Sequence, residues 1–138
     1  MLFRSTLAEF GFVVESAGLD ADLAGVPESY QSRGGVFRVI EDDSGTVVGC
    51  GGLYPETDKT VELRKMYFRP SIRGRGLGRR LLEELIAEAR RRRFARIELE
   101  TASNLETALA LYQRAGFVQT NAVKHSCRCD LTFALDLD

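Results

Sequence analysis

The spacing of apolar residues changes its period along the chain, and each change marks a predicted element. Near the N-terminus apolar residues recur at helical spacing over residues 2–10, and a second short helix is predicted over residues 20–30. Further on, β-branched and aromatic runs alternate with turn residues, which is typical of strands. These predicted strands cover residues 36–40, 46–54 and 60–69. Because short turns join them and Pro70 stops the last one, we expect an antiparallel meander.

The helical period returns beyond Pro70 and predicts a strong helix that begins near Leu77. The apolar positions of this helix share one face, and they are Leu77, Leu81, Leu82, Leu85, Ile86 and Ala89. Residues 94–101 then alternate apolar and polar side chains, which predicts another strand. Since a helix separates it from strand 60–69, we expect these two strands to run parallel after a crossover connection.

The C-terminal part of the chain is predicted to add one more helix and two strands. Ser103 and Glu106 fit the Ser-x-x-Glu capping box at the start of that helix, and Gly116 ends it. Residues 117–120 and 130–137 have the pattern of two last strands. No internal repeat and no low-complexity linker interrupts this order of elements.

Length and composition are those of a single globular domain. The 138 residues are 44% hydrophobic and 28% charged, which suits one core and is too short for a second domain. We expect one domain over residues 1–138 that folds alone or as a small oligomer such as a homodimer. No run approaches the roughly 18 apolar residues of a membrane span, and the start lacks the apolar core of a signal peptide. We therefore expect a cytoplasmic protein without a membrane partner.

The chain has three cysteines, an odd number without the spacing of a disulfide framework, which favours reduced thiols. His125, Cys127 and Cys129 recur at a spacing of two, which would place them on one face of a strand and invites a metal-binding interpretation. Because a fourth ligand is not in view, a polar connection beside an edge strand is the better interpretation. We expect no metal.

Positive charge gathers in one central segment, although the whole chain has a formal net charge of −1. Residues 63–96 hold 12 basic and 3 acidic side chains, whereas residues 1–62 hold 4 basic and 11 acidic ones. This asymmetry indicates a polyanionic ligand that binds at one place on an otherwise acidic protein. Nucleic acid and a phosphorylated cofactor both fit the charge pattern.

A glycine-rich loop lies inside the basic segment, directly before the strong helix. Gly74, Gly76 and Gly78 remove Cβ atoms where the backbone bends, so consecutive N–H groups can converge on one anion at the positive end of the helix dipole. The loop is not a Walker A motif, because no Gly-Lys-Ser/Thr follows, and it does not match the Gly-x-Gly-x-x-Gly of dinucleotide-binding folds. A purely structural turn is the alternative.

Two motifs lie in the second half of the predicted domain. They are Arg73-Gly74-Arg75-Gly76-Leu77-Gly78 and Leu111-Tyr112-Gln113-Arg114-Ala115-Gly116-Phe117. They match the Arg/Gln-x-x-Gly-x-Gly/Ala signature and the Leu-Tyr-x-x-x-Gly-Phe element of the GNAT superfamily of N-acetyltransferases, which residues 36–117 also resemble in element order. The resemblance implies an α+β fold with a mixed, mostly antiparallel central sheet, a splayed parallel pair at its centre and helices on both faces. It also implies acetyl-CoA as the acyl donor.

The resemblance implies where acetyl-CoA binds. In the family a β-bulge parts the strand before the glycine loop from the next strand, so that unpaired backbone groups bond the pantetheine arm. Residues 66–68 take those positions here, and the loop amides of residues 73–79 hold the pyrophosphate. The implied cofactor-binding residues are Met66, Tyr67, Phe68, Arg73, Gly74, Arg75, Gly76, Leu77, Gly78, Arg79 and Asn104.

The resemblance also implies two catalytic residues. Tyr112 matches the tyrosine that protonates the departing CoA thiolate, a role that a phenol of pKa about 10 can fill before solvent reprotonates it. A core tyrosine is the alternative. Glu62 aligns with a strand glutamate that in some members removes a proton from the incoming amine, and a surface glutamate with water as the base is the alternative.

Two features depart from the family pattern. The commonest pattern has Asn seven residues before the tyrosine, whereas Leu105 stands there and Asn104 lies one residue earlier, which leaves a helix-capping role for Asn104 open. The first strand of the family precedes its first helix, whereas this chain begins with a helix-like pattern at Leu2. The acceptor side of the cleft is therefore the part that the resemblance leaves open.

Together these observations predict transfer of acetyl from acetyl-CoA to a primary amine of a small molecule or peptide, by direct attack in a ternary complex. The alternative is a noncatalytic CoA-binding or nucleic-acid-binding module that uses the basic segment 64–96. Tyr112 and Glu62 favour the enzyme, because a phosphate-binding surface requires neither. We therefore expect no nucleic-acid partner.

Overall fold

The computed structural model describes residues 34–41, 47–70, 74–122 and 129–137 of the chain. The helices predicted over residues 2–10 and 20–30 lie outside these ranges. The described elements are, in chain order, β1 (Val36–Glu41), β2 (Val47–Pro55), β3 (Thr60–Phe68), α2 (Leu77–Arg91), β4 (Arg96–Thr101), α3 (Glu106–Arg114), β5 (Val118–Thr120) and β6 (Leu131–Asp136). The strands and helices predicted beyond residue 35 are confirmed, with ends that differ by one or two residues.

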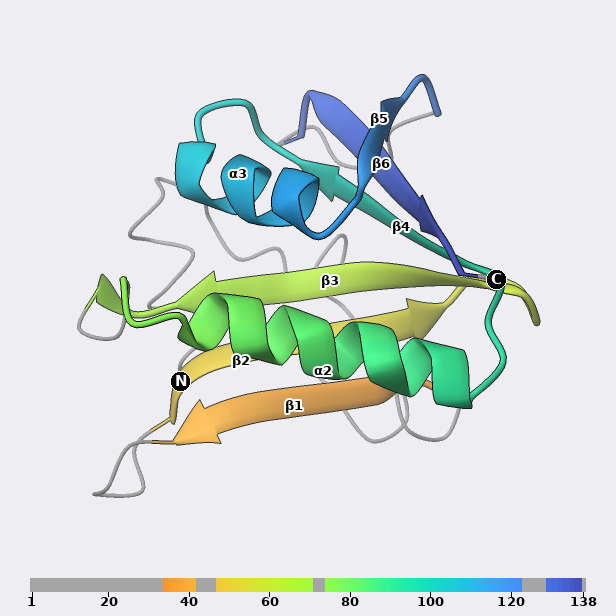
Figure 1. Cartoon of the computed structure of the whole chain (residues 1–138), viewed down its shortest axis with the longest axis horizontal. Helices are drawn as coiled ribbons and strands as arrows, with labels where there is room; N and C mark the ends of the chain where they lie inside the picture. Colours follow the sequence, from red (N-terminus) through yellow and green to blue (C-terminus); the bar gives the residue numbers. More distant parts are fainter. Residues whose placement is uncertain (1–33, 42–46, 71–73, 123–128, 138) are drawn as a thin grey trace, which may run out of the picture.

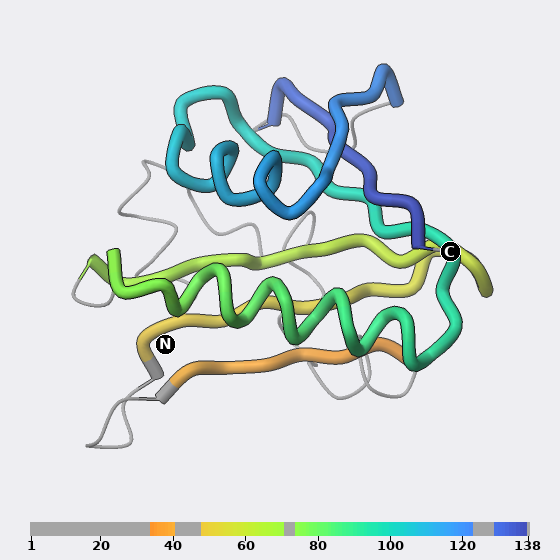
Figure 2. The backbone as a smooth tube through the Cα atoms, in the orientation of Figure 1, coloured from red at the N-terminus to blue at the C-terminus, as the bar shows by residue number. Residues whose placement is uncertain are grey.

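The described strands form one mixed sheet in the order β1-β2-β3-β4-β6-β5. Within it, β3 and β4 run parallel at the centre, and the other neighbouring strands are antiparallel. Both described helices lie in front of the sheet in Figure 1, and the tube in Figure 2 shows α2 running alongside β2 and β3. The predicted α+β fold with a mixed, mostly antiparallel sheet is confirmed.

The two central strands part soon after they meet. Residues 60–62 of β3 pair with residues 96–98 of β4, whereas β3 continues to Phe68 and β4 to Thr101 without further pairing to each other. The predicted splayed pair is therefore confirmed, and the carboxyl-terminal half of β3 has no neighbour on its β4 side within the described sheet.

A β-bulge shifts the register of β3 beyond this point. Arg64 pairs with Gly52 and Tyr67 with Cys50, so Lys65 and Met66 together oppose the single residue Gly51. Lys65 has a φ of 59°, in the left-handed region that side chains other than glycine rarely adopt.

The bulge changes which side chains share a face of the sheet. A regular strand would place Glu62, Arg64 and Met66 on one face. The bulge instead turns Met66 toward α2, where a Cβ on Gly51 would overlap the Met66 sulfur and would also touch Leu85. Met66 is thus separated from Glu62 and Arg64, which stay on the opposite face.

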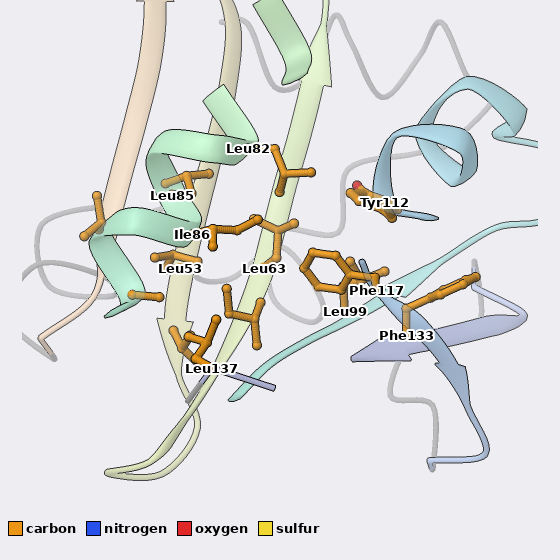
Figure 3. Close-up of a cluster of buried hydrophobic side chains, with 14 of the residues drawn as sticks. Leu53, Leu63, Leu82, Leu85, Ile86, Leu99, Tyr112, Phe117, Phe133 and Leu137 are labelled. Carbon is orange, nitrogen blue, oxygen red and sulfur yellow. The ribbon is translucent and has the colours of Figure 1, made fainter. Parts of the chain in front are cut away.

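The core lies between the sheet and the apolar face of α2 (Figure 3). Leu81, Leu82, Leu85 and Ile86 of α2 are buried. The sheet contributes Leu53, Val61, Leu63, Ile97, Leu99 and Phe133. Because each such side chain contributes about 1.5–3 kcal/mol on burial, this layer fixes α2 on the sheet, with its first turn beside the end of β3.

The predicted capping box before α3 is wrong. The helix begins at Glu106, its N-cap is Leu105, and no side chain caps it. The Ser103 hydroxyl instead donates to Asp130 Oδ2 at 2.6 Å, and the Ser103 N–H donates to Asp130 Oδ1 at 2.7 Å. Ser103 therefore binds Asp130, just before β6, and does not cap α3. The two oxygens of this carboxylate accept both the N–H and the hydroxyl of Ser103.

A glutamate of α2 binds two of the arginines at the C-terminal end of this helix. Glu88 is buried and forms ion pairs with Arg91, with Arg92 at 2.9 Å and with Arg38 of β1 at 3.3 Å. Arg92 also donates to the Gly34 carbonyl at 3.1 Å. The hydrogen bond from Arg92, with the nearby guanidinium charges, holds the pKa of Glu88 below its ordinary value. These contacts tie the end of α2 to the edge of the sheet.

We predict that Glu88→Gln lowers the free energy of unfolding at pH 7 by about 1–3 kcal/mol, because the guanidinium groups lose their buried acceptor. Since the folded pKa of Glu88 is lowered, its contribution is present above the unfolded pKa of about 4.3 and is lost as the pH falls below it. Urea titrations from pH 7 to pH 3 should show the two proteins converging at acid pH. Glu84→Gln, which removes an exposed carboxylate of the same helix, is the control. Equal losses in both variants would contradict this account.

Candidate active site

A cavity of about 1080 Å³ lies between the end of β3, α2 and α3. Most of the site residues predicted from the sequence line it. They are Met66, Tyr67, Phe68, Gly74, Gly76, Leu77, Gly78, Arg79, Asn104 and Tyr112. Arg75 is exposed and does not line the cavity, Glu62 lies elsewhere, and Arg73 lies outside the described residues.

The first turn of α2 presents backbone donors to this cavity. The first N–H groups of any α-helix lack an intrahelical acceptor. At the N-cap Gly76 no side chain caps α2, and the first turn holds no acidic residue. Gly74 and Gly76 have φ values of 79° and 75°, which glycine adopts without strain. The amides of Leu77, Gly78 and Arg79 therefore face the cavity at the positive end of the helix dipole, an arrangement that suits a phosphate.

The cavity also has an apolar wall that lies largely outside the sequence motifs. Leu82 and Ile86 of α2 and Ala108 of α3 belong to it. Helical periodicity places these residues on the inward face of each helix, but it does not distinguish a core position from a cavity wall. Arg90 also lines the cavity, unlike its neighbours Arg91 and Arg92, which pair with Glu88.

Tyr112 lies in the last turn of α3 with 6% of its surface exposed. Its ring centroid lies 5.8 Å from that of Phe117, and Figure 3 shows the side chain reaching from the helix toward β3. Burial, with a smaller effect from nearby Cys129, raises the pKa of the Tyr112 phenol above its ordinary value. The phenol is therefore protonated throughout the neutral pH range.

Glu62 lies on the face of the sheet opposite α2, at the last paired position before β3 and β4 part. Its carboxylate forms an ion pair with Arg64, whose guanidinium carbon lies 3.9 Å from the centroid of the Tyr54 ring. Glu62 lines a small depression together with three other glutamates, Glu56, Glu98 and Glu100. The structure thus places the two predicted catalytic residues, Tyr112 and Glu62, in different hollows of the surface.

Two of the three residues that suggested a metal site lie outside the described part of the chain. His125 and Cys127 lie outside the described residues, whereas Cys129, a reduced cysteine, lies within them. Among the described residues no group of three or more His, Cys, Asp or Glu side chains could hold a metal ion. The absence of a metal stays a prediction.

Neither α2 nor α3, the helices within the described part of the chain, is long and apolar enough to cross a membrane.

Comparison with known proteins gives consistent results. The model of the acetyltransferase (GNAT) family matches residues 3–117. The uncharacterized N-acetyltransferase YjgM of Escherichia coli K12 is 38% identical over 121 residues, which cover 84% of this chain and 72% of YjgM. A GNAT-family acetyltransferase from Staphylococcus aureus Mu50 shares the fold with a TM-score of 0.87 at 20% identity, over 99% of this chain and 89% of that one. The yncA protein of Salmonella typhimurium, solved with its cofactor acetyl-CoA, is 30% identical with a TM-score of 0.72, over 98% of this chain and 85% of that one. The chain belongs to the acetyltransferase (GNAT) family.

Proposed function

We propose that the protein transfers acetyl from acetyl-CoA to a primary amine of a small molecule or peptide, as a single domain over residues 1–138 in the cytoplasm. The cavity beside the splay carries this proposal, because the start of α2, the end of β3 beyond its pairing with β4, and Tyr112 surround one space. The acetyl-CoA in yncA supports it. The odd number of cysteines, without the spacing of a disulfide framework, supports a reducing compartment.

The cavity fits the chemistry of acetyl-CoA from one end to the other. The amides of Leu77, Gly78 and Arg79 would hold the pyrophosphate at the start of α2. Beyond the bulge, no strand of the described sheet lies on the β4 side of β3, and the pantetheine arm would lie along this side of β3 as an added strand would. The apolar wall with Leu82 and Ile86 excludes water from the thioester end.

Tyr112 would supply the proton that the leaving group needs. After direct attack by the amine, the carbon–sulfur bond breaks and the sulfur departs as a thiolate. The Tyr112 phenol donates its proton to that sulfur and is reprotonated by solvent. Its raised pKa ensures that the proton is in place before each turnover, although it also makes the phenol a weaker acid.

The acceptor would enter from the opposite face of the sheet, at the point where β3 and β4 part. The glutamates around Glu62 favour an ammonium group there. A primary amine is mostly protonated at pH 7 and must lose a proton before it attacks, so Glu62 would take that proton directly or through a water molecule. Arg64 holds the Glu62 carboxylate beside the parting strands.

The ion pairs of the basic segment argue against a nucleic-acid-binding module. A surface that binds nucleic acid offers its cations to phosphates. Here five arginines in and beside α2 and β4 are engaged with carboxylates of the chain itself. These pairs are Arg79 with Glu83, Arg80 with Glu84, Arg91 and Arg92 with Glu88, and Arg96 with Glu98 and Asp136.

We predict that Gly76→Asp weakens acetyl-CoA binding about 10- to 100-fold relative to Gly76→Asn. Both side chains tolerate the left-handed backbone and can cap α2, so the variants differ in a single negative charge beside the pyrophosphate. Isothermal titration calorimetry measures the difference, and circular dichroism checks that both variants fold. Equal affinities for the two folded variants would remove the pyrophosphate from this position.

We predict that Tyr112→Phe lowers kcat about 10²- to 10⁴-fold, because the substitution removes the proton donor and keeps the ring in its buried position. Affinity for acetyl-CoA should change little. Since the phenol is protonated throughout the neutral range, the loss should be similar from pH 6 to pH 8.5. Tyr54→Phe, which removes a phenol that does not line the cavity and keeps the ring against Arg64, should leave kcat close to that of the native chain. Full kcat in Tyr112→Phe across the pH profile would return Tyr112 to a packing role.

We predict that Glu62→Gln lowers the rate most at low pH, where the amine is most protonated and depends most on a base. Profiles of kcat/KM for the amine against pH measure this effect. Glu98→Gln, in the same depression, should lower kcat/KM by a similar factor at each pH and so keep the shape of the native profile. A Glu62→Gln profile parallel to the native one would assign the base to water.

A further inference from the structure

The side chain of Cys50 in β2 lies against the β-bulge of β3, where the regular pairing of the two strands is interrupted. Cys50 of β2 has no exposed surface, and its thiol donates to the Lys65 carbonyl at 3.1 Å. The backbone of Tyr67 hydrogen-bonds the same sulfur. One sulfur thus contacts the residues on both sides of Met66.

The conformation of the bulge needs such support. A residue other than glycine is strained in the left-handed region, and this conformation persists where surrounding contacts hold it. Lys65 adopts this conformation with a φ of 59°, and its carbonyl meets a fully buried side chain. A buried carbonyl without a donor would add a further cost.

Cysteine suits this position because a thiol both donates and accepts hydrogen bonds and otherwise packs as a small apolar group. Burial raises the pKa of the Cys50 thiol to about 12, so the proton that it donates to Lys65 is retained at physiological pH. The same burial makes Cys50 a poor nucleophile.

We propose that Cys50 is a positioning residue for the cofactor site: its sulfur holds Lys65 and Tyr67, and thereby keeps residues 66–68 in the conformation that lines the cavity. This inference rests on the proposed function, because residues 66–68 matter for activity only if acetyl-CoA binds along them. The contact lies on the face of the sheet opposite α2, so Cys50 acts on the cofactor through the strand rather than by touching it.

Four single variants of the full chain test this role. Cys50→Ala removes both hydrogen bonds, Cys50→Val removes them while filling the space, and Cys50→Ser keeps a donor and an acceptor. Val48→Ala is the matched control, since Val48 is buried on the same face of β2, two residues away. The measurements are the Kd for CoA by calorimetry, the free energy of unfolding in urea, and amide hydrogen exchange at residues 65–68 without CoA.

We predict that Cys50→Ala and Cys50→Val raise the Kd for CoA about tenfold and speed amide exchange at residues 65–68, consistent with the loss of buried hydrogen bonds. Cys50→Ser should recover most of both properties. Val48→Ala should lose stability alone.

Two results would overturn the role of Cys50. One is native CoA affinity and native exchange in the folded Cys50→Ala or Cys50→Val chain. The other is a Val48→Ala variant that weakens CoA binding as much as they do. If the native chain itself fails to bind CoA, the proposed function is refuted instead. The exchange of residues 65–68 then decides alone whether the sulfur holds the bulge.

Discussion

The structure depends on the parting of two parallel strands at the centre of the sheet. β3 and β4 exchange hydrogen bonds over three residues each and then separate. Backbone groups that leave a ladder must find other partners, because a buried unpaired N–H or C=O is costly. In this chain the bulge at Lys65 and Met66 changes the register of β3 just beyond that point, and the half of the strand beyond its pairing with β4 becomes one wall of the cavity. The opening is therefore part of the fold and does not require a movement to form.

At this parting, the groups that suit a phosphorylated ligand and the groups that suit a cation lie on opposite sides of the sheet. On the side of α2, glycine backbone and a helix start without a cap or an acidic first turn suit a phosphorylated ligand. On the other side, Glu62 and its neighbouring glutamates suit a cation. The core under α2 and the ion pairs of Glu88 hold the helix against the sheet, so the position of its first turn follows from packing at a distance from the site.

Much of this arrangement was predictable from the sequence, and the failures have physical reasons. The period of apolar residues located each described strand and helix, because one face of every element is buried in the same core. The two motifs predicted that Gly76, Leu77 and Tyr112 belong to one site, and all three line the same cavity. The capping box failed because Ser103 is bound by Asp130, a partner distant in sequence. The sequence alone does not show that Met66 and Glu62 lie on opposite faces of the sheet. This depends on the conformation of Lys65, which is held by contacts with β2 that local sequence does not reveal. The cavity wall at Leu82 and Ile86 has the same pattern as a core helix.

Titration of CoA into the ¹⁵N-labelled chain, followed by backbone amide chemical shifts, tests the central claim most directly. If the cofactor lies along the parted strand and at the start of α2, the largest shifts will fall on residues 66–68 and 76–79. The amides of Arg91 and Arg92, whose side chains are held by Glu88, will change little. Shifts concentrated at the arginine-rich end of α2, with none in β3, would contradict the account.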